Sequence, residues 1–351
     1  MPRMRFRRPG PGQKGLFDQL EHGKRLAETP TPLDRLDQTV DFEGFRDLLL
    51  DLLGYRKTED KGGNAAFDPV FMLKVLVLQK FHGLSDEATE FQIRDRFSFL
   101  RFLGLQPGDA TPDRNTIWDF KERLGPDGVV ELFRAFNARL AEAGVRGQEG
   151  KIVDASFVEV PRQRNGRTEN QQIKEGEEPG DWKKHPAKRC QKDLDARWAN
   201  KGQEVHYGYK NHVKADAQTK LIEDYRVSAA SEHDSQCFEA LVAKGDGTVW
   251  ADSAYRSRES LGMLRKKKVK AQINQKGQKG RPLTEAQQRE NRQKSRVRAR
   301  VEHVFGYQAN TMGADRIRTR GMMRAAREIG LGNLVYNLMR SIVLGALFRQ
   351  A

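Results

Sequence analysis

The chain has 351 residues, which is enough for two domains of ordinary size. Hydrophobic residues make up 37% and charged residues 32%, so a soluble protein with a buried core is expected. Lys and Arg number 63 against 48 Asp and Glu, and the resulting net charge of +15 favours a polyanionic partner.

The positive charge is concentrated in one part of the chain. Residues 1–150 contain 23 basic and 24 acidic residues, whereas residues 251–300 alone contain 16 basic and 4 acidic residues. An even distribution of lysine for solubility does not give this pattern, so nucleic acid is the expected partner. We further expect the basic segment to mark the groove that binds DNA.

Several classes of protein are excluded early. The two cysteines, Cys190 and Cys237, are too few for a disulfide framework or a zinc cluster, and they fit a reducing compartment. The basic start of the chain, MPRMRFRRPGPGQKG, lacks the apolar stretch of a secretory signal. Residues 329–348 are apolar but interrupted by two asparagines and an arginine, which favours a buried amphipathic helix over a membrane span. A cytoplasmic location is therefore expected.

The first part of the chain predicts helices. Residues 1–40 are rich in Pro, Gly and Arg and are expected to form a basic flexible arm. Residues 41–147 have helical spacing of apolar residues and predict an all-helical domain that recognises DNA ends, mediates dimerisation, or does both. The helices are expected in FRDLLLDLLG, AAFDPVFMLKVLVLQKFHG, LSDEATEFQIRDRFSFLRFLG, TPDRNTIWDFKERLG and PDGVVELFRAFNARLAEAG.

The pattern changes near residue 148, and residues 148–351 predict an α/β domain. The β-branched segment 151–160 indicates a strand, and the polar residues 161–204 indicate an exposed insertion. The order of the later elements suits a mixed sheet with flanking helices. We expect a hairpin over 206–216 and 220–228, strands at 248–252 and 269–274, and helices over 234–244, 256–267, 285–309 and 322–348.

Three acidic residues are candidates for metal chemistry. Asp154 lies within the first predicted strand, Asp252 follows the strand TVWA, and Glu302 lies on the basic late helix. Ligands bind at strand ends in α/β sheets, and carboxylate oxygens suit Mg²⁺ ions that serve phosphodiester chemistry. A purely structural alternative remains, in which the two aspartates cap turns and Glu302 pairs with neighbouring arginines.

Histidines and tryptophans give weaker signals. His233 and Asp234 are expected to cap the following helix, and His206 and His212 share a strand face but are weak evidence for a metal. His303, next to Glu302, points about 100° away from it on a helix. In the insertion, Trp182 and Trp198 are expected to stack on unpaired bases, and for Trp198 anchoring of the loop is an equal alternative.

Basic side chains are the expected DNA contacts because Lys and Arg neutralise phosphates. In YGYK the lysine is expected to meet a phosphate, whereas Tyr207 and Tyr209 are expected to pack on the strand face. The predicted DNA contacts are Lys210, Arg256, Lys266, Lys267, Lys294, Arg296, Arg298, Arg300 and the aromatic Trp198.

The order of several segments resembles one protein family over about residues 42–345. These segments are FDPVFMLKVLVLQKFHGLSDEATEFQIRDRFSFLRFLGL, TPDRNTIWDFKERLG, VDASFVEVPRQ, DLDARWANKGQEVHYGYKNHVKAD, SAASEHDSQ, VWADSAYRS and SRVRARVEHVFG. Together they resemble the DDE transposases of bacterial insertion sequences, specifically insertion-sequence family five, or InsH-type.

The resemblance implies a ribonuclease-H-like catalytic domain with a Mg²⁺-dependent triad of Asp154, Asp252 and Glu302, in which Mn²⁺ substitutes for Mg²⁺. Related transposases carry Tyr-x-x-Arg-x-x-x-Glu and a Lys seven residues after the Glu. Here Arg298 matches the Arg, but Ser295 and Ala309 occupy the Tyr and Lys positions.

The resemblance further implies that a homodimer binds the terminal inverted repeats of its element, with TPDRNTIWDFKERLG as a helix-turn-helix-like unit and the N-terminal arm in a minor groove. It would then cut the DNA and join the 3′-hydroxyls to target DNA. Two alternatives share these features: a metal-dependent nuclease without strand transfer, and a non-catalytic DNA-binding regulator.

Overall fold

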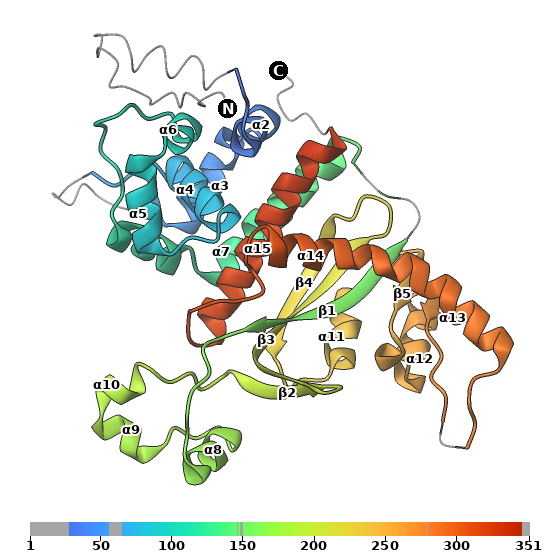
Figure 1. The fold of residues 1–351 in the computed structure, drawn as a ribbon. Helices are drawn as coiled ribbons and strands as arrows, with labels where there is room; N and C mark the ends of the chain where they lie inside the picture. Colours follow the sequence, from blue (N-terminus) through green and yellow to red (C-terminus); the bar gives the residue numbers. More distant parts are fainter. Residues whose placement is uncertain (1–27, 56–64, 146, 148–149, 279, 346–351) are drawn as a thin grey trace, which may run out of the picture.

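The computed structural model describes residues 28–55, 65–145, 147, 150–278 and 280–345. The chain forms a helical part, a six-stranded mixed sheet with helices on both faces, and a small lobe of short helices (Figure 1). None of the helices in these residues is long and apolar enough to cross a membrane. Cys190 and Cys237 are free thiols.

The sheet centres on two long strands. β1 (Lys151–Glu159) pairs antiparallel with β3 (Glu204–Asp216), with Asp154 opposite Val213. On its other side β1 pairs parallel with β5 (Thr248–Ala251), which pairs parallel with β6 (Lys270–Ile273). The outer edge of β3 is covered by β2 (Arg197–Lys201) along one half and by β4 (Ile222–Ala229) along the other. The mixed sheet expected from the sequence is confirmed.

Helices cover the two faces of this sheet from different parts of the chain. Val153, Val249 and Ile273 face a cluster formed with α11 (Asp234–Leu241) and α12 (Arg258–Lys266). The other face packs against α7, α15 and the run of α13, η4 and α14. The bounds of these last elements are α7 Arg114–Glu142, α13 Glu285–Arg298, η4 Ala299–Val301, α14 Glu302–Asn310 and α15 Met322–Leu344.

The helical part follows the expected order with one difference, which concerns the start of the described chain. The last two predicted helices are confirmed as the two segments of α7, which meet at a kink where Gly125 has a non-helical backbone with a φ of 61° before Pro126. The expected arm over 1–40 is wrong for its last residues, because Pro32 to Thr39 form helix α2, which begins at a Thr31 capping box and buries Leu33 and Leu36. Residues 1–27 lie outside the described residues. The elements are α2 Pro32–Thr39, η1 Glu43–Phe45, α3 Arg46–Leu52, α4 Pro69–Phe81, α5 Asp86–Asp95 and α6 Phe97–Leu103.

Helix α15 joins the helical part to the sheet. It packs against α2, α4, α7 and β4, and most of its residues are buried, which agrees with the buried helix predicted for this segment. Its asparagines are satisfied internally: Asn333 exchanges hydrogen bonds with Asn211 of β3, and Asn337 accepts from the Ile222 amide. One hydrophobic core therefore runs from α2 to the sheet.

The insertion 161–204 is more ordered than its composition indicates. It contains α8 (Arg167–Lys174), α9 (Gly180–Lys184), α10 (Pro186–Arg189) and the strand β2. The three helices form a lobe that projects from the body in Figure 1. Polar contacts hold the lobe together, since Trp182 and Lys188 both donate to Glu169 (2.7 and 2.8 Å).

Candidate active site

Each of the three candidate carboxylates sits at a defined place in the fold. Asp154 lies on the central strand β1, and Asp252 directly follows the neighbouring strand β5 as the N-cap of a 3₁₀ turn, η3 (Ser253–Tyr255). Glu302 is the first residue of α14, immediately after the 3₁₀ turn that interrupts the late helix. Because β1 and β5 are parallel neighbours, the two aspartates emerge at the same region of the sheet.

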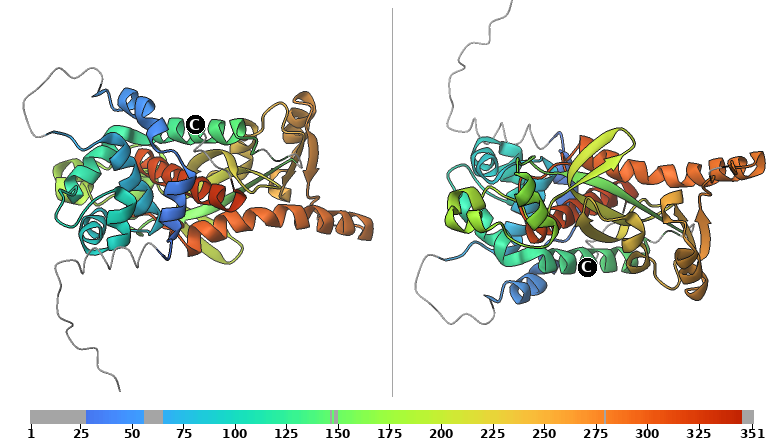
Figure 2. Two further views of the ribbon diagram at one scale, coloured as in Figure 1. Left: turned by 90° about the horizontal axis from the view of Figure 1, so that it is seen from above. Right: turned by 90° about the horizontal axis from the view of Figure 1, so that it is seen from below.

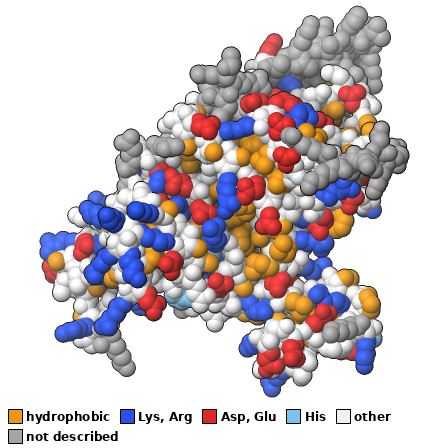
Figure 3. All heavy atoms as spheres, turned by 180° about the vertical axis from the view of Figure 1, so that it is seen from behind, with side chains coloured by type: hydrophobic (Ala, Val, Ile, Leu, Met, Phe, Trp, Pro, Cys, Tyr) orange, Lys and Arg blue, Asp and Glu red, His pale blue; other side chains and the backbone are white. Residues whose placement is uncertain are grey.

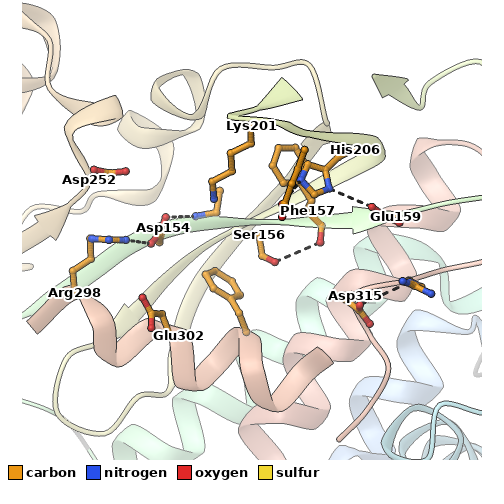
Figure 4. A pocket seen from close by; sticks show the side chains of 14 residues that line it. Asp154, Ser156, Phe157, Glu159, Lys201, His206, Asp252, Arg298, Glu302 and Asp315 are labelled. Atoms are coloured by element: carbon orange, nitrogen blue, oxygen red, sulfur yellow. Dashed lines mark hydrogen bonds and ion pairs between the residues drawn. The ribbon is translucent and has the colours of Figure 1, made fainter. Parts of the chain in front are cut away.

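All three carboxylates line one open pocket of about 660 Å³. Figure 4 shows Asp154, Asp252 and Glu302 together at one end of this pocket, with Asp315, Glu159 and His206 at the other. Six carboxylates line the pocket against three Lys or Arg side chains. The pocket itself is therefore mainly acidic, and of the basic side chains in segment 251–300 Arg298 lines it. That this segment marks the groove that binds DNA stays a prediction.

Asp154 has two kinds of partner. Its Oδ1 accepts a hydrogen bond from the Ala155 amide at 2.9 Å, and its Oδ2 accepts one from the Arg298 guanidinium at 2.7 Å. Burial raises the pKa of Asp154, the negative charge of Asp252 adds to this, and Arg298 opposes it. The net direction is upward, so the positive charge of Arg298 does not fully compensate the burial and the neighbouring carboxylate.

The residue types at this end of the pocket fit a hard divalent cation. All three side chains offer carboxylate oxygens, which are the donors that Mg²⁺ and Mn²⁺ prefer. The raised pKa of Asp154 indicates negative charge that a cation would stabilise. As they stand, no three His, Cys, Asp or Glu side chains of the described residues lie close enough together to hold an ion.

The alternative prediction, in which these residues cap turns or pair with arginines, is also partly correct. The Asp252 side chain accepts from the Ser253 amide at 2.5 Å and so caps a turn. The arginine that pairs with a candidate carboxylate is Arg298, but its partner is Asp154 on β1. A capping or paired aspartate still has unused oxygen lone pairs, so these contacts do not preclude a ligand role.

Sequence reasoning missed the far end of the pocket. His206 stacks on Phe157 with ring centroids 4.1 Å apart, and its Nδ1 lies 3.2 Å from Glu159 Oε1. Lys201 and Glu204 line the same wall. The alternation of side chains along the β2–β3 hairpin could have identified this wall. Trp198 lies opposite Tyr207, so these two side chains lie on one face of the sheet and His206 lies on the other.

Several of the predicted DNA contacts are used inside the protein. Lys210 is buried, pairs with Asp234 at 2.7 Å and donates to the Glu232 carbonyl, so its predicted phosphate contact is wrong. Lys294 is buried beside Glu290 and donates to the Ile273 carbonyl, and the same correction applies. Lys267 donates to the Glu239 and Val242 carbonyls at the end of α11, which restrains its amine.

Other predicted contacts remain at the surface. Arg256, Lys266 and Arg296 are exposed, and Trp198 is 47% exposed with Arg162 over its ring. Arg300 is half-buried and donates to the Ala217 carbonyl at 2.9 Å. Figure 3 shows basic side chains gathered at the end of the molecule that carries α12 and α13. Of the predicted DNA contacts, Arg298 lines the pocket, and the exposed basic side chains lie outside its lining.

The histidine and aromatic predictions are resolved residue by residue. His233 caps α11 as expected. His212 is buried against Ser228, and burial lowers its pKa to about 4, so it does not share a site with His206. Tyr207 and Tyr209 are buried in the core, as predicted. Trp182 is completely buried and anchors the lobe, so its base-stacking alternative is wrong.

Comparison with known families decides the class of protein. A model described as "Transposase DDE domain" matches residues 146–338, and one described as "Transposase domain (DUF772)" matches residues 21–123. The chain belongs to the DDE transposases. A solved structure, "Cryo-EM structure of piggyBac transposase synaptic complex with hairpin DNA (SNHP)", is 10% identical, with a TM-score of 0.46, and the match covers 93% of this chain and 79% of that chain.

As a DDE transposase, the protein is an enzyme that cleaves DNA and joins DNA strands with the help of a divalent metal. The matched region includes β1, β5 and α14, and therefore the elements that carry Asp154, Asp252 and Glu302. The second matched region includes α2 to α6 and the start of α7.

Proposed function

We propose that Asp154, Asp252 and Glu302 are the catalytic carboxylates of this transposase and that they hold Mg²⁺. The observation that carries the proposal is that the three side chains, which lie at least 50 residues apart in the chain, line one end of one pocket. When bound, the cations activate an attacking oxygen and stabilise the leaving oxygen of a phosphodiester. Mn²⁺ has the same preference for carboxylate oxygens and substitutes.

The residues around the triad have roles that follow from their contacts. Arg298 compensates part of the charge of Asp154 and holds its carboxylate in one orientation. The Ser253 amide fixes the Asp252 carboxylate, which is tied to the end of β5. Glu302 is exposed at the start of α14 and so remains open to solvent and ligand. The acidic lining disfavours DNA phosphates until positive charge is added.

The sheet supports a ribonuclease-H-like assignment. Three antiparallel strands, β4, β3 and β1, are followed by two strands parallel to β1, and the first aspartate lies on the central strand. The segments VDASFVEVPRQ, VWADSAYRS and SRVRARVEHVFG further support a transposase of insertion-sequence family five.

The transposase acts on double-stranded DNA in this proposal, as a homodimer that holds the two terminal inverted repeats of its element. Arg256 and Lys266 are the proposed contacts to the phosphates of these repeats, because both are exposed. Arg296 is also exposed and Arg300 is half-buried, and both are proposed contacts to DNA away from the end that is cut. The helical part, with the exposed Trp118 on α7, is the proposed region for end recognition or dimerisation.

A strand-transfer assay tests the proposal. Purified protein is incubated with labelled inverted-repeat ends, either intact or pre-cut, and with a plasmid target in Mg²⁺, Mn²⁺ or EDTA. We expect cleaved and joined products only with metal, and loss of both in Asp154→Asn, Asp252→Asn and Glu302→Gln while DNA binding is retained. Cleavage without joining would instead indicate a nuclease, and undiminished cleavage by Asp154→Asn would contradict the triad.

A further inference from the structure

A second group of charged side chains lies at the turn between β3 and β4, outside the catalytic pocket. Arg300 donates to the Ala217 carbonyl at 2.9 Å, and Arg340 of α15 donates to the Thr219 carbonyl at 2.8 Å. The Tyr336 hydroxyl donates to the Lys220 carbonyl at 2.9 Å and lies 3.4 Å from His303 Nδ1. Three parts of the chain thus bring four basic side chains to one turn. These form the turn cluster: Lys220, Arg300, His303 and Arg340.

The positive charges of the turn cluster act on one another. Burial lowers the pKa of Lys220, and the charges of Arg340 and Arg300 lower it further. No carboxylate of the described residues forms an ion pair with Lys220 or Arg340. Within the part of the chain that the structure describes, folding thus leaves the charges of Lys220 and Arg340 without an ion-pair partner, which favours an anionic partner.

An arginine stripe on α13 leads to the turn cluster. Arg289, Arg292 and Arg296 are exposed and spaced three and four residues apart, so they share one face of the helix. Arg300 follows four residues later, about 16 Å from Arg289 at 1.5 Å per residue. The opposite face of α13 carries Arg298, which contacts Asp154. In Figure 2 the far end of α13 projects beyond the rest of the molecule.

We propose that the stripe and the turn cluster form one cationic track that binds the backbone of target DNA. This inference rests on the proposed function, since it assumes a transposase that must hold a second duplex. The DNA end that is cut has to bring a phosphate to the pocket faced by Arg298 and Glu302. A straight duplex bound there cannot also contact the opposite face of the same helix.

The chemistry of the track suits target DNA. Arginine and lysine contacts to phosphate carry no sequence information, and a target has no fixed sequence. A duplex carries one charge per about 1.7 Å of its axis, so 16 Å of track faces roughly nine phosphates. Each neutralised phosphate releases counterions and makes binding steeply dependent on salt.

The experiment removes four charges of the track together with a matched control. The track variant is Arg289→Ala, Arg292→Ala, Arg296→Ala and Lys220→Gly. Glycine is used because Lys220 has a left-handed φ of 62°, which glycine adopts without strain. The control is Arg167→Ala, Lys174→Ala and Lys184→Ala in the lobe, with Lys268→Gly, whose φ is 58°. Both variants lose the same charge.

Binding is measured first, in EDTA, with a random-sequence duplex at several salt concentrations. We expect the slope of log K against log salt to fall by about 3.6 in the track variant, because each of the four lost contacts contributes about 0.9, and to stay unchanged in the control. An unchanged slope in the track variant, or an equal fall in the control, would overturn the proposal. Metal plays no part in this measurement, so it is independent of the triad.

Strand transfer then distinguishes the target from the element's own end. In the track variant, joining of pre-cut ends to a plasmid should fall at least about tenfold at physiological salt, while cleavage of intact ends stays within about twofold. A parallel loss of cleavage would show that the track serves the cut end, and the target assignment would be wrong. Failure of the triad proposal is different, since wild-type protein would then give no metal-dependent products.

Discussion

The catalytic pocket and the lobe built by α8, α9 and α10 use carboxylates in opposite ways. In the lobe, Glu169 accepts from Lys188, Trp182 and the Gly166 amide, and these contacts lower its pKa to about 2. In the pocket, burial raises the pKa of Asp154 although Arg298 contacts it. The lobe is a region whose charges are balanced by folding. In the pocket, Arg298 compensates the carboxylate charge of Asp154 only in part, which is typical of a functional site.

The largest effect is expected at the pocket. Asp154→Asn, Asp252→Asn and Glu302→Gln each remove a proposed metal ligand, so DNA cleavage should fall by about 10²–10³-fold or more. The melting temperature of the metal-free protein should change little. Of the three carboxylates, Asp154 alone loses an ion pair, the one with Arg298. Cleavage rates and melting curves check both parts. Glu204→Gln, at the far end of the same pocket, is the control and should keep most activity.

A smaller effect is expected from the arginine that faces the pocket. Arg298→Gln removes the partner of Asp154 and should slow cleavage by about 10- to 100-fold, as is usual for groups that orient a metal ligand. Arg296→Gln, two residues earlier on the outward face, removes the same charge and should leave cleavage of the DNA end nearly unchanged. Equal losses in the two variants would mean that charge alone, and not the contact with Asp154, matters. Single-turnover cleavage makes this comparison.

A substitution in the lobe should change local stability and leave DNA cleavage unchanged. Because the pKa of Glu169 is lowered from its usual 4.5 to about 2, its contacts stabilise the lobe above pH 4.5, and the stabilisation is lost as the pH falls toward 2. Glu169→Gln should therefore open the lobe about tenfold more often at pH 7, with cleavage at the pocket unaffected. Amide hydrogen exchange of α8 to α10 and the fluorescence of Trp182 report the change. The difference between variant and wild type should shrink at low pH.

The smallest effect on DNA is expected at Lys210. Its amine is buried against Asp234, so Lys210→Met should leave the salt dependence of duplex binding unchanged. The lost ion pair and hydrogen bond should lower the melting temperature by several degrees. A fall of the salt slope by about 1 would restore Lys210 as a phosphate contact.

Much of the fold follows from local sequence patterns. The β-branched run around Asp154, the strand before Asp252 and the apolar spacing of α4 and α15 are local signals, and each is found close to where it was expected. The lobe was missed because its order depends on contacts such as that of Trp182 with Glu169, which join residues far apart in a polar segment.

The candidate site was only partly predictable for the same reason. The strand ends identify Asp154 and Asp252 as candidates, but the phase of α13 against the sheet decides that Arg298 faces the pocket and Arg296 does not. Likewise, Lys210 and Lys294 belong to basic segments that composition alone marks as exposed, yet partners from other elements bury them. Long-range packing sets these outcomes.

The place of helix α15 in the chain determines when the protein can complete its folding during synthesis. It supplies the shared wall between the helical part and the sheet, through Leu334, Val335 and Leu338, yet it is the last helix of the described chain to leave the ribosome. At about 5–20 residues per second it emerges roughly 15–60 s after α2. Until then neither half can complete its core. The nascent protein thus acquires the packing shared by its two halves only after α15 has been synthesised.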